Sequence, residues 1–104
     1  MKTPADCQTM QDIRAEIDRL DVALIGLLAK RAGYIDRAAE VKTSVGLPAR
    51  IDDRVEQVIA NVRAEAKAQG LAPDLAESLW RHLVDWSIAR EETVLGAKAP
   101  EETR

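Results

Sequence analysis

Six side chains in this sequence are of the types that bind a small anion and stabilise charge during a reaction. They are three arginines, one lysine, one serine and one glutamate: Arg14, Arg31, Lys42, Arg54, Ser87 and Glu91. Guanidinium groups hold carboxylates through paired hydrogen bonds, and an ammonium group stabilises negative charge that develops in a transition state. The sequence shows no Gly-rich phosphate loop, no histidine pair and no nucleophile beside a base, and its only histidine is His82. We therefore expect a polyanion pocket that works by positioning and electrostatics, with no metal and no cofactor.

Two of these cations lie on an apolar stripe. Leu20, Leu24 and Leu27 recur at helical spacing, and Arg31 and Lys42 continue the same series. A helix buried along this stripe would bury their charges, and buried cations need anionic partners. The partner could be a ligand, or an Asp or Glu of a neighbouring helix in a purely structural ion pair. The residues alone leave both interpretations open.

The positions of the other four residues differ in how strongly they suggest a buried side chain rather than a solvent-exposed one. Ser87 and Glu91 are four residues apart, which places them on one helix face with apolar residues such as Val84. A salt bridge to a core cation is the simpler interpretation of Glu91 taken alone. Arg54 lies beside the inner row of its helix and near the N-terminal end, where the helix dipole favours an anion. Arg14 is one residue off the first stripe, a position typical of the surface.

Hydrophobic periodicity predicts an all-α fold with three helices, over residues 10–43, 51–69 and 73–95. Gly46 and Pro48 follow the first helix in a loop, and Gly70 ends the second. Asp74 is placed to cap the third helix. We expect one helical domain over residues 1–95 and a disordered tail over residues 96–104, because the tail is charged and has no periodicity.

The same periodicity predicts which residues face the core. In the second helix these are Ile51, Val55, Val58, Val62 and Ala66. In the third they are Leu75, Leu79, Leu83 and Trp86, with Trp80, Val84, Ile88 and Leu95 on adjoining rows. The first helix would be on the order of 50 Å long, whereas a compact domain of this size has a radius of gyration of about 13 Å. Its apolar stripe would stay in water unless something covers it, so we expect a homodimer.

Composition narrows the class of protein. Hydrophobic residues make up 46% of the 104 residues, aromatic residues only 3%, and there is no Phe, which favours helices over strands. The net charge of −3 argues against nucleic acid as a partner. Cys7 is the only cysteine and has no activating neighbour, so we expect a bystander thiol. No apolar run is long enough for a membrane span or a signal peptide, so we expect a cytoplasmic protein without a membrane partner.

Over about residues 5–95 the pattern resembles the all-helical chorismate mutases, and especially their isochorismate-pyruvate lyase relatives. The matching motifs are Ile13-Arg14, Ile17-Asp18, Leu20-Asp21, Lys30-Arg31, Val41-Lys42, Asp53-Arg54, and Ser87 with Glu91. The resemblance implies an intertwined homodimer with two equivalent sites, each completed by Arg14 of the other chain. It implies that Arg14 and Arg31 hold the substrate's carboxylates and that Arg54 is a further guanidinium lining the site. Lys42 and Glu91 would contact the ether oxygen.

The activity so implied is the rearrangement of chorismate to prephenate, a pericyclic step that needs no general base. Ser87, as a substrate-binding residue, and Glu91 resemble the mutases. Val55 stands where many mutases have a Glu that binds the substrate's hydroxyl, and Ile51 stands where some have an Asp. The resemblance implies that the lyases share this apolar pair. The main alternative is therefore an isochorismate-pyruvate lyase, which forms salicylate and pyruvate from isochorismate. A second alternative is a non-catalytic dimeric helical module. We favour the mutase.

Overall fold

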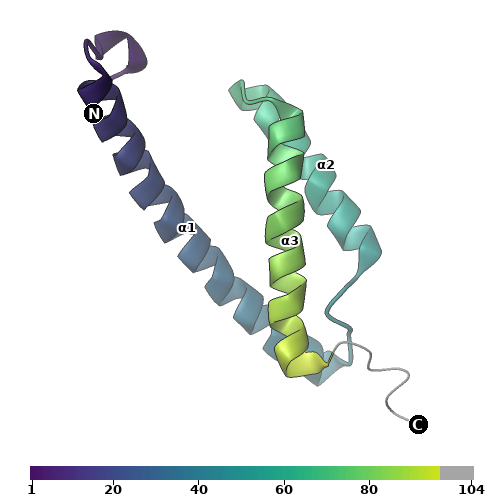
Figure 1. Cartoon of the computed structure of the whole chain (residues 1–104). Helices are drawn as coiled ribbons and strands as arrows, with labels where there is room; N and C mark the ends of the chain where they lie inside the picture. Colours follow the sequence, from purple (N-terminus) through teal and green to yellow (C-terminus); the bar gives the residue numbers. More distant parts are fainter. Residues whose placement is uncertain (97–104) are drawn as a thin grey trace. The chain divides into compact units, whose positions relative to one another are not determined.

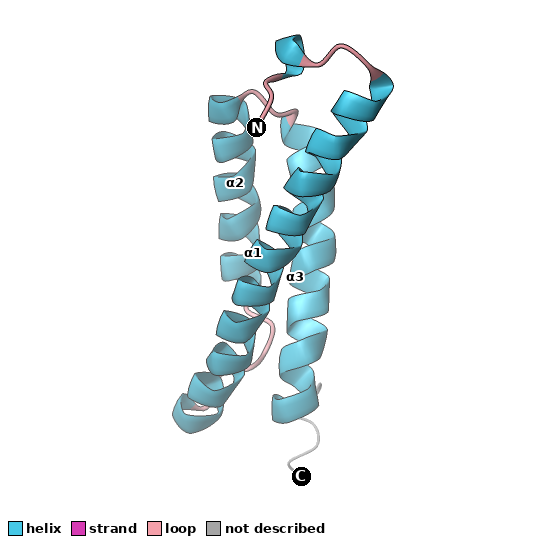
Figure 2. Ribbon diagram, turned by 90° about the vertical axis from the view of Figure 1, so that its left-hand side faces the viewer, coloured by secondary structure: helices cyan, strands magenta, loops and turns pink. Residues whose placement is uncertain are grey.

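A computed structural model describes residues 1–96, and the expectation of a disordered tail over 96–104 lies outside that range except for Gly96. Its elements are a short 3-10 helix η1 (Pro4–Asp6) and three α-helices, α1 (Met10–Val45), α2 (Asp52–Gln69) and α3 (Pro73–Leu95), shown in Figure 1. No strand occurs over residues 1–96 (Figure 2), so the all-α expectation is confirmed. None of the described helices combines the length and the hydropathy that crossing a bilayer requires.

Glycines end the first two helices, as the sequence indicated. Gly46 follows α1 with φ +76° and Gly70 follows α2 with φ +82°, a left-handed conformation that costs glycine little. In both places the residue after the glycine donates a backbone hydrogen bond to the carbonyl five residues earlier. Leu47 N–H bonds Lys42 O at 3.0 Å, and Leu71 N–H bonds Ala66 O at 2.8 Å. The bond at Leu47 closes α1, whose last residue, Val45, lies two residues beyond the predicted end at 43.

The prediction that Asp74 caps α3 is wrong. Ala72 is the N-cap residue and Pro73 is the first residue of the helix. Proline suits this position because its φ is already helical and its missing N–H would have no partner there. Asp74 therefore lies inside the first turn, where its carboxylate accepts a hydrogen bond from Arg63 of α2 at 2.9 Å.

The chain consists of two compact units, of which the first comprises Met1–Tyr34. Its N-terminal segment is held to the start of α1 by Asp12. The Asp12 carboxylate accepts the backbone N–H of Gln8 at 2.9 Å and lies 3.3 Å from Lys2 Nζ, while Asp12 N–H bonds Thr9 Oγ1 at 3.0 Å. The hydrogen bond from Gln8, together with Lys2, lowers the pKa of Asp12. The first turn of α1 is thereby capped.

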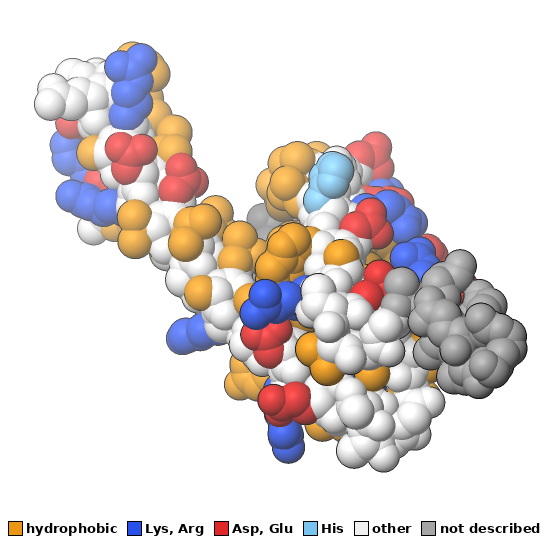
Figure 3. Space-filling view, turned by 60° about the horizontal axis from the view of Figure 1, so that its bottom comes forward, with side chains coloured by type: hydrophobic (Ala, Val, Ile, Leu, Met, Phe, Trp, Pro, Cys, Tyr) orange, Lys and Arg blue, Asp and Glu red, His pale blue; other side chains and the backbone are white. Residues whose placement is uncertain are grey.

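The apolar stripe of the first unit is in contact with solvent. Its members are between 38% and 60% exposed: Ile13, Ile17, Leu20, Leu24 and Leu27. Figure 3 shows hydrophobic side chains lying openly on the molecular surface. A stripe of this size without a cover is unusual for a stable isolated chain.

The second unit begins at Ile35 and contains the end of α1 together with α2 and α3, which pack side by side (Figure 1). Its buried apolar residues are Ala39, Ala49, Val55, Ile59, Ala66, Ala76 and Val84. In α2 the prediction is confirmed for Val55 and Ala66, whereas Val58 and Val62 are half-buried and Ile59 is buried in addition.

In α3 the prediction is confirmed for Val84 of the adjoining rows, and Leu83 of the main row is half-buried, but the rest of the main row is not buried in this chain. Leu75, Leu79 and Trp86 are about half exposed, and the buried row is Ala76, Val84, Ser87 and Glu91. Both rows have helical spacing and contain apolar residues, so periodicity alone does not choose between them. The buried row is the one that brings polar side chains into the unit.

A chain of exposed ion pairs links α2 to α3. Arg81 bonds Glu77 at 2.8 Å and Glu56 at 3.3 Å, and Arg63 bonds Glu77 and Asp74, both at 2.9 Å. The guanidinium of Arg81, followed by that of Arg63, lowers the pKa of Glu77. These contacts hold the outer faces of α2 and α3 in register.

Candidate active site

Lys42 and Glu91 form an ion pair inside the second unit. Lys42 is in the last turn of α1 and Glu91 is in the C-terminal half of α3, and Lys42 Nζ donates to Glu91 Oε1 at 2.6 Å. The two side chains are only 19% and 6% exposed, so neither charge is well solvated. Removing such a pair from water costs free energy. A ligand that binds the charged groups would offset part of this cost. The geometry agrees equally with a structural ion pair, and the catalytic role of both residues stays a prediction.

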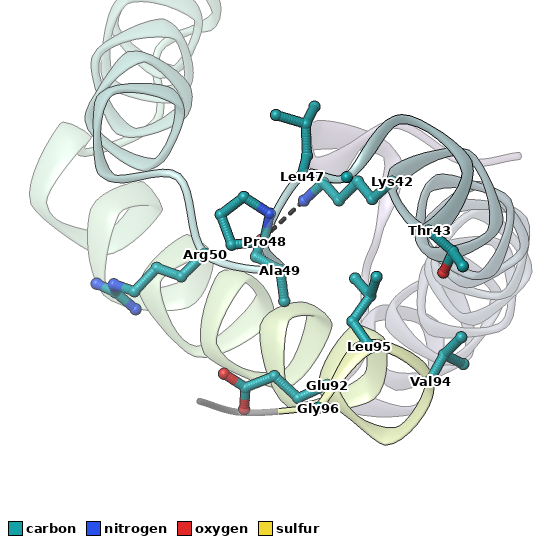
Figure 4. Close-up of a pocket in the computed structure, with 11 residues that line it drawn as sticks. Lys42, Thr43, Leu47, Pro48, Ala49, Arg50, Glu92, Val94, Leu95 and Gly96 are labelled. Atoms are coloured by element: carbon teal, nitrogen blue, oxygen red, sulfur yellow. Dashed lines mark hydrogen bonds between the residues drawn. The ribbon is translucent and has the colours of Figure 1, made fainter. Parts of the chain in front are cut away.

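A backbone carbonyl completes the contacts of Lys42. Its ammonium group donates a second hydrogen bond to Ala49 O at 2.7 Å, drawn as the dashed line in Figure 4. Ala49 is buried and lies in the loop between α1 and α2. An ammonium group has three N–H donors, so these two acceptors leave one N–H for a substrate oxygen. Sequence reasoning missed this contact because a backbone carbonyl has no residue signature.

Ser87 is buried one turn before Glu91 on the same face of α3. Its hydroxyl donates to Leu83 O at 2.7 Å within the helix, which is how serine commonly satisfies its donor in a helix interior. The predicted sharing of a face by Ser87 and Glu91 is therefore seen in the structure. The substrate-binding role of Ser87 stays a prediction.

Arg90, next to Glu91, attaches α3 to the end of α1. Its guanidinium bonds both carboxylate oxygens of Asp36, at 2.8 and 3.2 Å. The pair lowers the pKa of Asp36 and raises that of Arg90, in each case mainly through these hydrogen bonds. These two parallel hydrogen bonds orient α3 against α1 at the residue next to Glu91. The partners are 54 positions apart in the chain, and nothing in the sequence indicated their contact.

An open cavity of about 520 Å³ lies beside Lys42. Figure 4 shows the three segments around it: the end of α1, the loop after Gly46 and the end of α3. Its lining residues are Lys42, Thr43, Gly46, Leu47, Pro48, Ala49, Arg50, Glu92, Val94, Leu95 and Gly96. A volume of this size accommodates a small organic molecule. Arg50 is held at its rim by Asp52 at 2.8 Å.

The structure does not bring Arg54 into bonding contact with Lys42 or Glu91. Arg54 is exposed in the first turn of α2 and donates to Gln57 Oε1 at 2.7 Å. A long guanidinium side chain on a helix surface has several rotamers available, and its contact with Gln57 is a weak surface bond. Its role in holding a substrate stays a prediction.

Arg14 and Arg31 belong to the first unit, where Arg14 is exposed and Arg31 is half-buried. Desolvation by burial lowers the pKa of Arg31, which nevertheless keeps its charge. That Arg14 and Arg31 bind the same substrate as Lys42 stays a prediction. Over residues 1–96 no three His, Cys, Asp or Glu side chains are grouped closely enough to hold a metal ion.

Comparison with known proteins gives a family match over most of the chain. The family model described as chorismate mutase type II matches residues 13–92. The isochorismate pyruvate lyase of Pseudomonas aeruginosa is 34% identical over 92 residues, which are 88% of this chain and 89% of that protein. The chorismate mutase of Methanocaldococcus jannaschii is 22% identical over 88 residues, or 85% of this chain and 89% of its own length.

A longer relative matches as well. The T-protein of Enterobacter agglomerans is 39% identical over 79 residues, which are 76% of this chain and 21% of that protein. The chain thus spans about a fifth of the T-protein and nearly nine tenths of the Pseudomonas lyase.

Proposed function

This chain belongs to the chorismate mutase type II family, and from that premise we propose that it catalyses the rearrangement of chorismate to prephenate. The observation that best supports the proposal is the shielded pair of Lys42 and Glu91, joined at 2.6 Å. The reaction breaks a carbon–oxygen bond while a carbon–carbon bond forms in the same molecule. It needs a compact substrate conformer and stabilisation of negative charge on the ether oxygen, and no group has to accept a proton.

Lys42 supplies the charge in this proposal. Its third N–H donates a hydrogen bond to the ether oxygen, where negative charge builds as the carbon–oxygen bond lengthens. Because the ammonium is already held by Glu91 and Ala49, little reorganisation is needed when that charge appears. The bond to oxygen strengthens in the transition state and therefore accelerates the chemical step.

Glu91 donates the second hydrogen bond to the same oxygen, and for this it must be protonated. In the structure its carboxylate faces Lys42 and is almost completely buried. The protonated acid then donates to the ether oxygen, and Lys42 keeps its positive charge.

A homodimer completes the site in this proposal. The exposed stripe from Ile13 to Leu27 is covered by the same stripe of a second copy, which satisfies the apolar surface of both chains. Arg14 of one chain then enters the site of the other and holds a substrate carboxylate, and Arg31 holds the second. The Arg54 side chain leaves Gln57 and points towards the substrate. Ser87 binds the substrate from α3.

A second candidate activity is that of an isochorismate pyruvate lyase. It is favoured by the relative from Pseudomonas aeruginosa, which matches over nearly the full length of both chains. Val55 supports it too, because it is buried and apolar in the first half of α2, where a carboxylate would otherwise bind a hydroxyl. The lyase breaks the same kind of carbon–oxygen bond, transfers a hydrogen to the departing pyruvate and leaves salicylate. Lys42 would serve the same ether oxygen.

Separate incubation of the purified protein with chorismate and with isochorismate tests both activities. Chromatography identifies prephenate, salicylate with pyruvate, or neither. Lys42→Ala should remove the activity, whereas Lys67→Ala, at an exposed lysine in the last turn of α2, should keep it. Lack of turnover of both substrates, together with no thermal stabilisation by a transition-state analogue, would leave the non-catalytic helical module as the function.

A further inference from the structure

Lys42 is held by the loop after α1 at two points. Its backbone carbonyl accepts Leu47 N–H at 3.0 Å, and its side-chain ammonium donates to Ala49 O at 2.7 Å. Residues 47–49 therefore contact both the main chain and the reactive end of one side chain. No other lysine in the described part of the chain donates a hydrogen bond to a backbone carbonyl seven residues away.

We propose that Gly46 is a positioning residue for Lys42, because it sets the course of the loop that presents the Ala49 carbonyl to the ammonium group. This inference rests on the proposed function and adds a residue to it. Gly46 is among the residues that line the cavity beside Lys42, but in the proposal it contributes no binding group to the substrate. It acts through Ala49, which is buried and whose carbonyl accepts the hydrogen bond of the Lys42 ammonium at 2.7 Å.

The backbone of Gly46 explains why this residue is sensitive. Its φ of +76° is a conformation that side-chain-bearing residues rarely adopt, although a Cβ built there would meet no heavy atom within 4 Å. An alanine at position 46 is therefore opposed by its backbone conformation rather than by a clash. If the backbone at position 46 relaxed to a negative φ, the direction of the chain at the start of the loop would change. Because the φ of Pro48 is fixed, the loop could not absorb this change before Ala49, and the Ala49 carbonyl would move.

The direction of the third N–H of Lys42 depends on this carbonyl. Glu91 alone, at 2.6 Å, would leave the ammonium group able to rotate about its bond to the carboxylate. A second acceptor removes that rotation and directs the remaining donor. The carbonyl is neutral, so it orients the ammonium without cancelling its charge. This is the preorganisation that a developing negative charge requires.

Gly70 provides a matched control at the end of α2. Its φ is +82°, its built Cβ also meets nothing within 4 Å, and the following residue makes the same five-residue backbone bond, from Leu71 to Ala66. A role limited to ending a helix would make Gly46→Ala and Gly70→Ala alike. A positioning role makes only the first affect Lys42.

The test compares kcat, KM and thermal stability for Gly46→Ala, Gly70→Ala and Gly46→Asn. Both alanine variants should lose similar thermal stability, because both carry the same backbone strain. Only Gly46→Ala should lose kcat, by about ten-fold or more, with KM changed less than about three-fold. Gly46→Asn should recover most of the loss, since asparagine tolerates the left-handed conformation. Equal kcat in the two alanine variants would overturn the proposal.

A second readout does not depend on turnover. In protein labelled with ¹⁵N-lysine, the ammonium protons of Lys42 should exchange slowly with water in the wild type and in Gly70→Ala, and faster in Gly46→Ala. Unchanged exchange in Gly46→Ala would contradict the proposal even if activity fell. If the wild type turned over neither substrate, the proposed function would fail while the exchange rates still decided the positioning role. If Gly46→Ala does not fold, Pro48→Ala takes its place, with faster exchange expected and unchanged exchange refuting the idea.

Discussion

Replacing Lys42 by methionine removes the ammonium group and keeps a flexible side chain of similar length. The substitution leaves Glu91 with its side chain 6% exposed and without its cation, and it leaves Ala49 O without a donor. Removing one partner of a buried pair costs about 3–5 kcal/mol, and the value here should be near the lower end because the Lys42 side chain is 19% exposed and reaches solvent. In the proposed reaction the same change removes a preorganised donor, which costs about 3 kcal/mol in kcat, or roughly 10²-fold.

Glu91→Gln in the same background separates the two effects. The double variant Lys42→Met with Glu91→Gln carries no buried charge, so its free energy of unfolding should return most of the way to that of the wild type. Its kcat should stay low, because no cation faces the ether oxygen. Denaturant unfolding and steady-state kinetics of the wild type, both single variants and the double variant measure this cycle.

Three outcomes would refute the reasoning. Wild-type kcat in Lys42→Met would show that the lysine is a structural cation. Recovery of kcat along with stability in the double variant would show that activity had been lost only through damage to the fold. A coupling energy near zero between the two positions would mean that the 2.6 Å contact is not formed in solution.

Three further predictions concern other parts of the molecule. Glu91→Gln should raise mutase turnover at pH 8, because the amide donates a hydrogen bond to the ether oxygen without needing an added proton; no gain in the variant would remove Glu91 from the catalytic set. Sedimentation at micromolar concentration should give about 23 kDa, twice the chain mass of 11.4 kDa, and mixing Arg14→Ala with Lys42→Ala chains should restore about one wild-type site per mixed dimer; a folded monomer with full activity excludes this. The lowered pKa of Glu77 means that its contacts with Arg81 stabilise the fold above pH about 4.3 and lose this effect as pH falls through the lower folded-state value. Acid unfolding of Glu77→Gln should therefore depend less on pH in that range, and an unchanged dependence would show that the exposed pairs contribute nothing.

Periodicity and punctuation were enough to predict the helices of this protein. Apolar spacing with Gly46 and Gly70 placed the helix ends within two residues, because helix formation and termination depend on neighbouring residues. The same spacing identified Lys42 and Glu91 as charges on apolar rows. Burial of a charge is costly wherever the helices pack, so residues of this kind stand out before the packing is known.

Where the sequence allowed several helix faces or side-chain partners, the tertiary structure determined which one is used. The buried face of α3 contains Ala76 and Val84 rather than Leu75 and Leu79, because the shape of the facing helix selects between two rows of similar hydrophobicity. Asp74 binds Arg63 across the helix pair instead of capping its own helix. Both results depend on neighbours that are distant along the chain.

Contacts made by the backbone, or between residues far apart in the chain, have no pattern in the sequence. The Ala49 carbonyl that holds Lys42 is chemically the same as every other carbonyl, and only the course of the loop brings it within 2.7 Å. Asp36 and Arg90 look like ordinary surface charges until α1 and α3 meet. The sequence thus determined the helices and the charged residues worth testing, whereas the packing determined their partners, because a hydrogen bond depends on distance and direction in space.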